Sequence, residues 1–154
     1  MIKLIAKDID GTLVKDGTLI IDPEYMTVIS KLIDKGIIFT VCSGRQFSSE
    51  QKLFAPIKDK LMYITDGGTV VRTPDRILKT YPMSNELWKD MCRMVRDELP
   101  ACDYFAASPD LCYAEDGASP IFHRLRDSYG FEMREIDDLT KLENDDIIKF
   151  TVYH

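Results

Sequence analysis

The alternation of short apolar runs with helical patterns over residues 2–65 constrains the fold of this sequence more than any other feature. A helix is predicted over residues 22–36, because Asp22 can cap it, Pro23 suits its first turn, and Gly36 ends it. A second, weaker helical pattern covers roughly 46–54. Strands alternating with helices predict a parallel sheet with right-handed crossovers, and therefore an α/β fold. The three predicted strands are 2–7, 37–42 and 61–65, of which 37–42 is a continuous apolar run typical of burial on both faces.

Each of these three strands is followed by a polar turn that contains glycine. The turns are residues 8–12, 43–45 and 66–68. Because ligands of parallel α/β sheets bind beyond the carboxyl ends of the strands, we expect the three turns to form one site.

The second half of the chain has a different order of predicted helices and strands, which indicates an α+β module. We place the boundary near residue 80, which divides the chain into a core over 1–80 and a second domain over 81–154. The expected elements are hairpins at 14–20 and 69–81, a helix over 84–99, a hairpin around 109–110, a helix over 119–129, a short helix near 138–143 and a strand over 147–153.

Composition and charge exclude several classes of protein. The net charge of −6 argues against a nucleic-acid surface, and it means that an anionic substrate must be held by local groups or a metal. The four cysteines fall at wide spacings with no C-x-x-C pair and no accompanying His cluster, which argues against a zinc site and a disulfide framework, so we expect reduced thiols. No apolar run approaches the length of a membrane span and no signal peptide is evident, which indicates a cytoplasmic protein.

The stretch IKLIAKDIDGTL places two carboxylates directly after an apolar strand. Asp8 and Asp10 are separated by one residue and should project toward the same cleft. One carboxylate can act as a nucleophile or metal ligand while the other acts as a general acid and base. The alternative is an ordinary polar turn, since Asp, Gly and Thr all favour turns.

These motifs resemble the haloacid dehalogenase-like superfamily, and within it the Cof-like phosphatases that carry a large cap. DIDGTLV (8–14) resembles the first motif of the family, and VCSGR (41–45) resembles the second. ITDGG (64–68) stands where Cof-like members usually have Asn-Gly-Ala, and residues 81–154 resemble most of the inserted cap. The resemblance implies a partial Rossmann-like core with an α+β cap.

The resemblance implies a magnesium-dependent phosphatase of small phosphorylated metabolites. Asp8 would attack phosphorus to form an aspartyl phosphate, Asp10 would exchange protons with the leaving alcohol and with water, and both would hold Mg²⁺. Ser43 would bind a phosphoryl oxygen, although a capping or turn serine is the alternative. Arg45 is either a substrate or cap contact or a solvated arginine.

The remaining expected substrate-binding residues are Gly44, Asp66 and Gly67. Asp66 departs from the usual asparagine, because an ionised carboxylate would repel a phosphate. Either this side chain faces another group or the substrate preference differs.

Two further motifs of the family, a lysine and an acidic pair that follow the cap, have no counterpart here. We therefore expect a truncated chain with impaired activity, and a non-catalytic remnant that binds a phosphometabolite or a partner chain is the alternative function. The strand over residues 2–7 would lie at a sheet edge, so a homodimer or higher oligomer through this strand is expected, without nucleic-acid or membrane partners.

Overall fold

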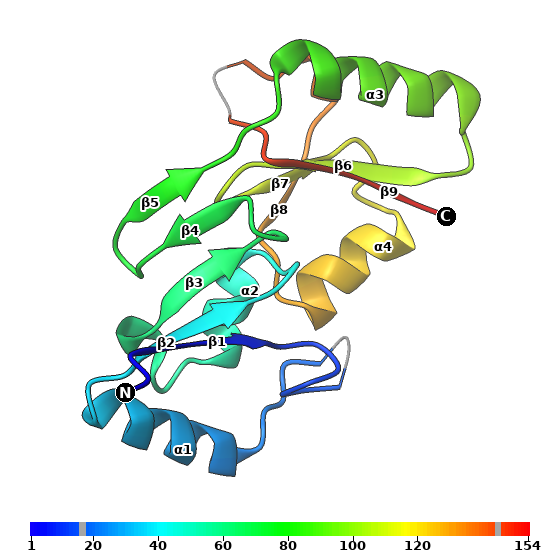
Figure 1. The fold of residues 1–154 in the computed structure, drawn as a ribbon. Helices are drawn as coiled ribbons and strands as arrows, with labels where there is room; N and C mark the ends of the chain where they lie inside the picture. Colours follow the sequence, from blue (N-terminus) through cyan, green and yellow to red (C-terminus); the bar gives the residue numbers. More distant parts are fainter. Residues whose placement is uncertain (16–17, 144–145) are drawn as a thin grey trace.

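The computed structural model describes residues 1–15, 18–143 and 146–154, and its elements form two packed units (Figure 1). The first, called here the five-stranded unit, lies in the lower part of Figure 1 and contains the amino terminus. Its elements are β1 (Leu4–Asp8), α1 (Pro23–Asp34), β2 (Ile38–Cys42), α2 (Phe47–Leu53), a 3-10 turn (Lys58–Lys60), β3 (Met62–Thr65), β4 (Val70–Arg72) and β5 (Ile77–Thr80).

The sheet of this unit runs in the order β1-β2-β3-β4-β5. The first three strands are parallel, with Leu4 opposite Ile38 and Thr40 opposite Met62, whereas β4 and β5 extend the sheet as an antiparallel hairpin. The predicted α/β class, the three parallel strands and the hairpin over 69–81 are therefore confirmed. The tip of the hairpin expected at Asp16-Gly17 lies outside the described residues.

Local sequence signals account for the ends of α1. The carboxylate of Asp22 accepts a hydrogen bond from the backbone N–H of Glu24 at 2.9 Å, and Pro23 occupies the first turn, where no backbone donor is needed. The helix turns its apolar stripe, including the buried Ile29, toward the sheet. Gly36 follows at a φ of 79°, a left-handed conformation that glycine adopts without a side-chain penalty.

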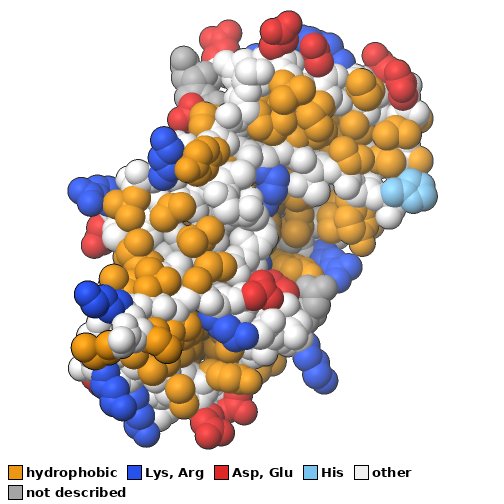
Figure 2. All heavy atoms as spheres, in the orientation of Figure 1, with side chains coloured by type: hydrophobic (Ala, Val, Ile, Leu, Met, Phe, Trp, Pro, Cys, Tyr) orange, Lys and Arg blue, Asp and Glu red, His pale blue; other side chains and the backbone are white. Residues whose placement is uncertain are grey.

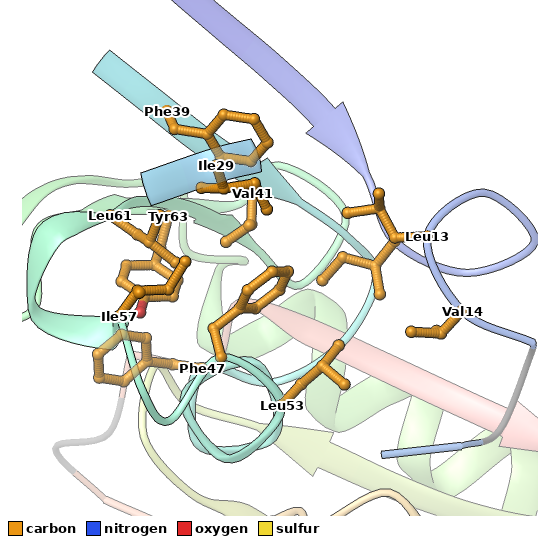
Figure 3. Close-up of a cluster of buried hydrophobic side chains, with 12 residues drawn as sticks. Leu13, Val14, Ile29, Phe39, Val41, Phe47, Leu53, Ile57, Leu61 and Tyr63 are labelled. Atoms are coloured by element: carbon orange, nitrogen blue, oxygen red, sulfur yellow. The ribbon is translucent and has the colours of Figure 1, made fainter. Parts of the chain in front are cut away.

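The core of the five-stranded unit lies on one face of its sheet (Figure 3). Helices α1 and α2 both cover this face, and Phe47 of α2 meets the ring of Tyr63 edge-on at 5.0 Å between centroids. The residues labelled in Figure 3 are Leu13, Val14, Ile29, Phe39, Val41, Phe47, Leu53, Ile57, Leu61 and Tyr63.

The opposite face of β1 and β2 is only partly covered. Phe39, Thr40 and Val41 are buried as expected, but the expectation that the whole run is buried on both faces is wrong at Ile38, which is 50% exposed. Leu4 on β1 is also exposed. Because both helices pack on the other face, these two apolar side chains remain open, and β1 forms the edge of the sheet as predicted.

The second unit, called here the four-stranded unit, contains α3 and all later elements. Its sheet runs in the order β8-β7-β6-β9, with β7 and β8 parallel and the other pairs antiparallel. Its elements are α3 (Asn85–Glu98), β6 (Asp103–Ala107), β7 (Cys112–Ala114), α4 (Pro120–His123), a π-helical turn (Arg124–Ser128), β8 (Met133–Glu135), a 3-10 turn (Leu139–Lys141) and β9 (Lys149–Tyr153).

Different elements cover the two faces of this second sheet. Trp88 and Cys92 of α3 pack on one face, and Phe122 of α4 packs on the other together with Val70 of β4. Val70, from the sheet of the first unit, therefore belongs to the core of the second unit. Strand β8 had no sequence prediction, because its three residues Met133–Glu135 are too few to display an alternating pattern.

None of the helices in the described ranges is long and apolar enough to span a membrane. All four cysteines are free thiols.

Candidate active site

The loop that follows β1 turns the two predicted catalytic carboxylates away from the core. Ile9, between them, is fully buried, and its carbonyl accepts hydrogen bonds from the backbone N–H groups of three residues of the turn. Gly11 in this turn has a φ of 71°, which favours glycine. The buried Ile9 side chain thus fixes the loop, and Asp8 is left exposed at the end of the strand.

Asp8 is held by a single hydrogen bond among the described contacts. Thr12 Oγ1 donates to Asp8 Oδ2 at 3.0 Å. This contact orients the carboxylate without covering it, so one oxygen atom remains available to a ligand or a reacting group.

Asp10 is held much more firmly by the turn that follows β2. Arg45 donates from Nε to Asp10 Oδ2 at 2.9 Å and from Nη2 to Asp10 Oδ1 at 2.6 Å. Ser43 Oγ adds a 3.3 Å hydrogen bond to Asp10 Oδ2. This bidentate pairing fixes both the position and the plane of the Asp10 carboxylate.

The interpretation of Arg45 as a solvated arginine is wrong. Its side chain is only 2% exposed, and besides Asp10 it binds the carbonyl of Thr18 at 2.9 Å. Its guanidinium group also lies 5.1 Å from the ring centroid of Tyr129 in the four-stranded unit. Arg45 therefore contacts the second unit, one of the expected alternatives, and at the same time positions Asp10.

The turn after β3 brings the third predicted motif to the same edge of the sheet. The N–H of Gly67 donates to the carbonyl of Ser43 at 3.0 Å, and the N–H of Asp66 donates to the carbonyl of Arg45 at 2.9 Å. Asp66 adopts a φ of 54°, the positive value that Asp and Asn tolerate better than most residues. The three polar turns thus lie together.

Asp66 faces a lysine from the four-stranded unit, which explains its departure from the usual asparagine. Lys149 Nζ donates to Asp66 Oδ1 at 2.6 Å and to the carbonyl of Gly44 at 3.1 Å. The Asp66 side chain is fully buried, and this burial raises the pKa of its carboxyl group, while Lys149 acts in the opposite direction. The pair joins β9 directly to the turn after β3.

Two cavities meet at this edge of the sheet. A cavity of about 290 Å³ is lined by Asp8, Ser43 and Gly44 together with Gly67. A larger one, of about 430 Å³, is lined by Asp10, Gly44 and Arg45 and by residues of the four-stranded unit. Gly44 lines both cavities, so the cavity beside Asp8 and the cavity beside Asp10 adjoin at this residue. The face drawn in Figure 2 shows a recess with hydrophobic side chains in its floor between the two units.

Three glycines leave the smaller cavity open. A Cβ atom added to Gly44, Gly67 or Gly68 would meet nothing within 4 Å. These turns can therefore admit a group of atoms close to the backbone, as a bound phosphoryl group requires.

The residues present could supply part of a magnesium site. Asp8 offers an exposed carboxylate, and Asp10 offers its backbone carbonyl, because its side chain is engaged by Arg45. The part of the chain that the structure describes contains no group of three or more His, Cys, Asp or Glu side chains able to hold a metal. Mg²⁺ is commonly bound through one or two carboxylates with water and substrate oxygens, so the donor set fits such a site.

Polar contacts across the interface fix the two units relative to each other. Gln46, which is fully buried, accepts a hydrogen bond from the N–H of Glu132 at 2.6 Å and donates to the carbonyl of the same residue at 3.3 Å. Lys52 donates to the carbonyl of Gly130 at 2.8 Å, and Arg72 forms an ion pair with Asp110. None of these residues was predicted from the sequence, because their partners are distant in the sequence.

Glu50 is a fully buried acid that was not predicted from the sequence either. Glu50 lies on the inner face of α2, and neither carboxylate oxygen has a hydrogen-bond partner among the described residues. Burial raises the pKa of Glu50 well above its ordinary value, and the neighbouring Asp66 carboxylate adds to the increase. A single Glu at a helical position that faces the sheet is the only signal that could have identified it.

Residues 5–154 match the family described as haloacid dehalogenase-like hydrolase. A phosphatase of 5-amino-6-(5-phospho-D-ribitylamino)uracil from Escherichia coli is 26% identical over 147 residues, which is 93% of this chain and 52% of that protein. A protein of the same name from Bacillus subtilis is 32% identical over 87 residues, covering 56% of this chain and 30% of its own.

A crystal structure from Eubacterium rectale shares the fold, with a TM-score of 0.87 and 81% identity over 99% of this chain. The present chain spans 58% of that structure and about half of the Escherichia coli protein. These matches agree with the resemblance to Cof-like phosphatases, and the chain belongs to the haloacid dehalogenase-like hydrolase family.

Proposed function

We propose that this protein is a phosphatase of small phosphorylated metabolites, with Asp8 as the nucleophile and Asp10 as the general acid and base. The observation that carries the proposal is the pairing of an exposed carboxylate with a firmly positioned one beside an open cavity lined by glycines. The names of the Escherichia coli and Bacillus subtilis relatives support it, because both describe phosphatases of a phosphorylated metabolite.

The two carboxylates would divide the reaction between them. An oxygen of Asp8 attacks phosphorus, a P–O bond forms to this carboxylate, and the bond from phosphorus to the leaving alcohol breaks. Asp10 gives its proton to the departing oxygen, so the alcohol leaves neutral. Asp10 then takes a proton from a water molecule that attacks phosphorus, which releases inorganic phosphate and restores Asp8.

The surrounding residues would position these groups. Arg45 and Ser43 hold the carboxylate of Asp10 by hydrogen bonds to its oxygens, which keeps it aimed at the leaving group. Ser43 also lines the cavity beside Asp8, where its hydroxyl would exchange the 3.3 Å hydrogen bond to Asp10 for one to a phosphoryl oxygen. Gly44 and Gly67 leave room for the phosphoryl group next to the backbone.

Mg²⁺ would be held by the Asp8 carboxylate and the Asp10 backbone carbonyl. When bound, the ion supplies positive charge that offsets the repulsion between the phosphoryl group and the attacking carboxylate.

Residues 81–154 would form the cap domain over a core formed by residues 1–80. Because Phe105, Leu125 and other residues of the second unit line the cavity that reaches Asp10, this domain would select the substrate. We further propose a cytoplasmic location. The acidic net charge supports a protein without a nucleic-acid partner.

A second candidate function is phosphometabolite binding without turnover. It is favoured by two ion pairs at the turns around the smaller cavity, in which Asp10 engages Arg45 and Asp66 engages Lys149. Neither guanidinium nor ammonium group is then free to neutralise charge that develops on the phosphoryl group.

Asp8→Asn separates the two functions. We expect the parent to hydrolyse 4-nitrophenyl phosphate with Mg²⁺, and to gain the mass of one phosphoryl group when the reaction is quenched. The variant should lose the hydrolysis rate by about 1,000-fold or more and show no added mass, because an amide is a poor nucleophile.

Asp34→Asn, an exposed change at the end of α1, serves as the matched control and should match the parent. Unchanged hydrolysis or labelling in Asp8→Asn would rule out Asp8 as the nucleophile. Ester binding by the parent without hydrolysis or labelling would instead favour the second candidate.

A further inference from the structure

The larger cavity has a defined place in the proposed reaction. Asp10 lies in its wall, and the Asp10 side chain is 26% exposed despite its contacts with Arg45. A general acid must lie within hydrogen-bond reach of the oxygen that it protonates. The leaving alcohol must therefore approach Asp10, which places it in this cavity, while the phosphoryl group occupies the smaller one beside Asp8.

The walls of this cavity are predominantly apolar and aromatic. Phe105 of β6 and Phe131 lie in the wall with only small exposed areas, and Ile121 and Leu125 add aliphatic surface. A sugar or other polyol in such a space would lose hydrogen bonds to water and regain few from the protein. An apolar ring would lose no such hydrogen bonds and would bury its two faces against the walls of the cavity.

Two tyrosines lie at the same cavity as the phenylalanines. Tyr129 follows the π-helical turn, and Tyr153 on β9 is 45% exposed. Aromatic side chains bind planar rings by offset or edge-on contacts, which a flexible aliphatic chain cannot match. The volume of about 430 Å³ falls within the range of small-molecule sites and suits one ring or a fused pair.

One cation at this cavity is not engaged by an acid of the described residues. The guanidinium group of Arg124 lies 5.8 Å from the ring centroid of Tyr129, and no ion pair joins it to the described carboxylates. Its nearby counterpart Arg126, by contrast, is bound to Asp127. Arg124 can therefore donate hydrogen bonds to an acceptor oxygen on the ring substituent.

We infer that the cavity between the two units selects phosphate monoesters whose alcohol carries a planar aromatic or heteroaromatic ring, with Tyr153 and Arg124 as specificity-determining residues. The inference rests on the proposed function, because it needs Asp10 to face the leaving group. Tyr153 contacts the ring, and Arg124 contacts an acceptor group on it.

The test measures binding by calorimetry in the Asp8→Asn background, which keeps esters intact, with Mg²⁺ present. The probes are inorganic phosphate, glycerol 3-phosphate, phenyl phosphate and 4-carboxyphenyl phosphate. We expect phenyl phosphate to bind at least about tenfold more tightly than glycerol 3-phosphate, which corresponds to about 1.4 kcal/mol. Tyr153→Ala should remove most of this preference, whereas Tyr81→Ala, an exposed tyrosine outside the cavity, should retain it.

Arg124→Gln should weaken binding of 4-carboxyphenyl phosphate about tenfold and leave phenyl phosphate within about twofold. Arg126→Gln is the matched control and should change neither affinity. Equal affinity of the Asp8→Asn protein for phenyl phosphate and glycerol 3-phosphate would overturn the inference while leaving the proposed function intact, because both esters would still bind. If neither inorganic phosphate nor any ester bound, the proposed function would fail and this inference with it.

Discussion

Replacing Lys149 by methionine tests whether a buried ion pair holds the four-stranded unit against the turn that follows β3. Methionine keeps most of the apolar stem of the side chain but removes the ammonium group that lies 2.6 Å from Asp66 Oδ1. The Asp66 side chain is fully buried, so its charge would be left without its main partner. Thr65 Oγ1 would still donate to Asp66 Oδ2 at 3.0 Å.

The magnitude follows from the asymmetry between removing one partner and removing both. Breaking a buried pair from one side costs about 3–5 kcal/mol, and we expect about 3 here because Lys149 is 23% exposed. At a urea m-value of about 2 kcal/mol per M, the unfolding midpoint should fall by about 1.5 M. Asp66→Asn should lower the free energy of unfolding by less than about 1 kcal/mol, because Lys149 keeps its hydrogen bond to the carbonyl of Gly44.

The pH dependence gives an independent check of the same pair. Burial already raises the pKa of Asp66 above its ordinary value of 3.8, so its contribution to stability falls as pH increases from that value through the folded-state pKa. Without Lys149 the pKa should rise further. The cost of Lys149→Met should therefore be small near pH 4 and full near pH 7.5.

Urea unfolding at both pH values, followed by circular dichroism, measures these differences. The double variant Asp66→Asn, Lys149→Met should recover to within about 1 kcal/mol of the parent, because no buried charge remains. Lys141→Met removes an 80% exposed lysine near Asp138 and should cost less than about 0.5 kcal/mol. A loss below about 1 kcal/mol for Lys149→Met at pH 7.5, with no dependence on pH, would refute the reasoning.

Three further predictions concern other parts of the molecule. Glu50→Gln should abolish a decrease in the free energy of unfolding that reaches about 1.4 kcal/mol per pH unit above pH 4.5, because burial raises the pKa of this carboxyl group and favours its neutral form. Urea midpoints between pH 5 and 8 measure this decrease, and the same pH dependence in parent and variant would contradict the prediction. Cys102 should react with Ellman's reagent at pH 8 well before Cys112, since Cys112 is buried and this burial raises the pKa of its thiol to about 12. The absorbance of the released product measures both reaction rates, and equal rates would contradict the prediction by showing that the second unit opens. The free edge of β1 should support self-association through residues 2–7, so light scattering should show an oligomer that Leu4→Lys dissociates, and a parent that stays monomeric at high concentration would disprove this.

The elements that could be predicted are those whose signals are local. The Asp22-Pro23 start and Gly36 end fix α1 within a few residues, and the apolar runs of β1, β2 and β3 lie where their patterns indicated. The convergence of three polar turns follows from the parallel order alone, since the carboxyl ends of parallel strands share an edge. Asp8 and Asp10 could be singled out for this reason before any contact was known.

The contacts that could not be predicted join residues far apart in the sequence. Arg45 lies 35 residues from Asp10, and Lys149 lies 83 residues from Asp66. Nothing in the local sequence distinguishes either cation from a solvated surface residue, because the partner of a charged side chain is set by the folded structure. The short strand β8 could not be predicted either, because it is defined by its pairing with β7.

These long-range contacts are also the ones that determine the geometry of the site. The two cavities meet at Gly44, whose carbonyl accepts a hydrogen bond from Lys149 of β9, and β9 also contributes Tyr153 to the larger cavity. Gln46 binds the backbone of Glu132 on the other side of the interface. The distance between Asp8 and the wall of the larger cavity is therefore set by contacts on both sides of the turn over residues 43–45. A change at Lys149 should alter which ester fits the site even though this residue lines neither cavity.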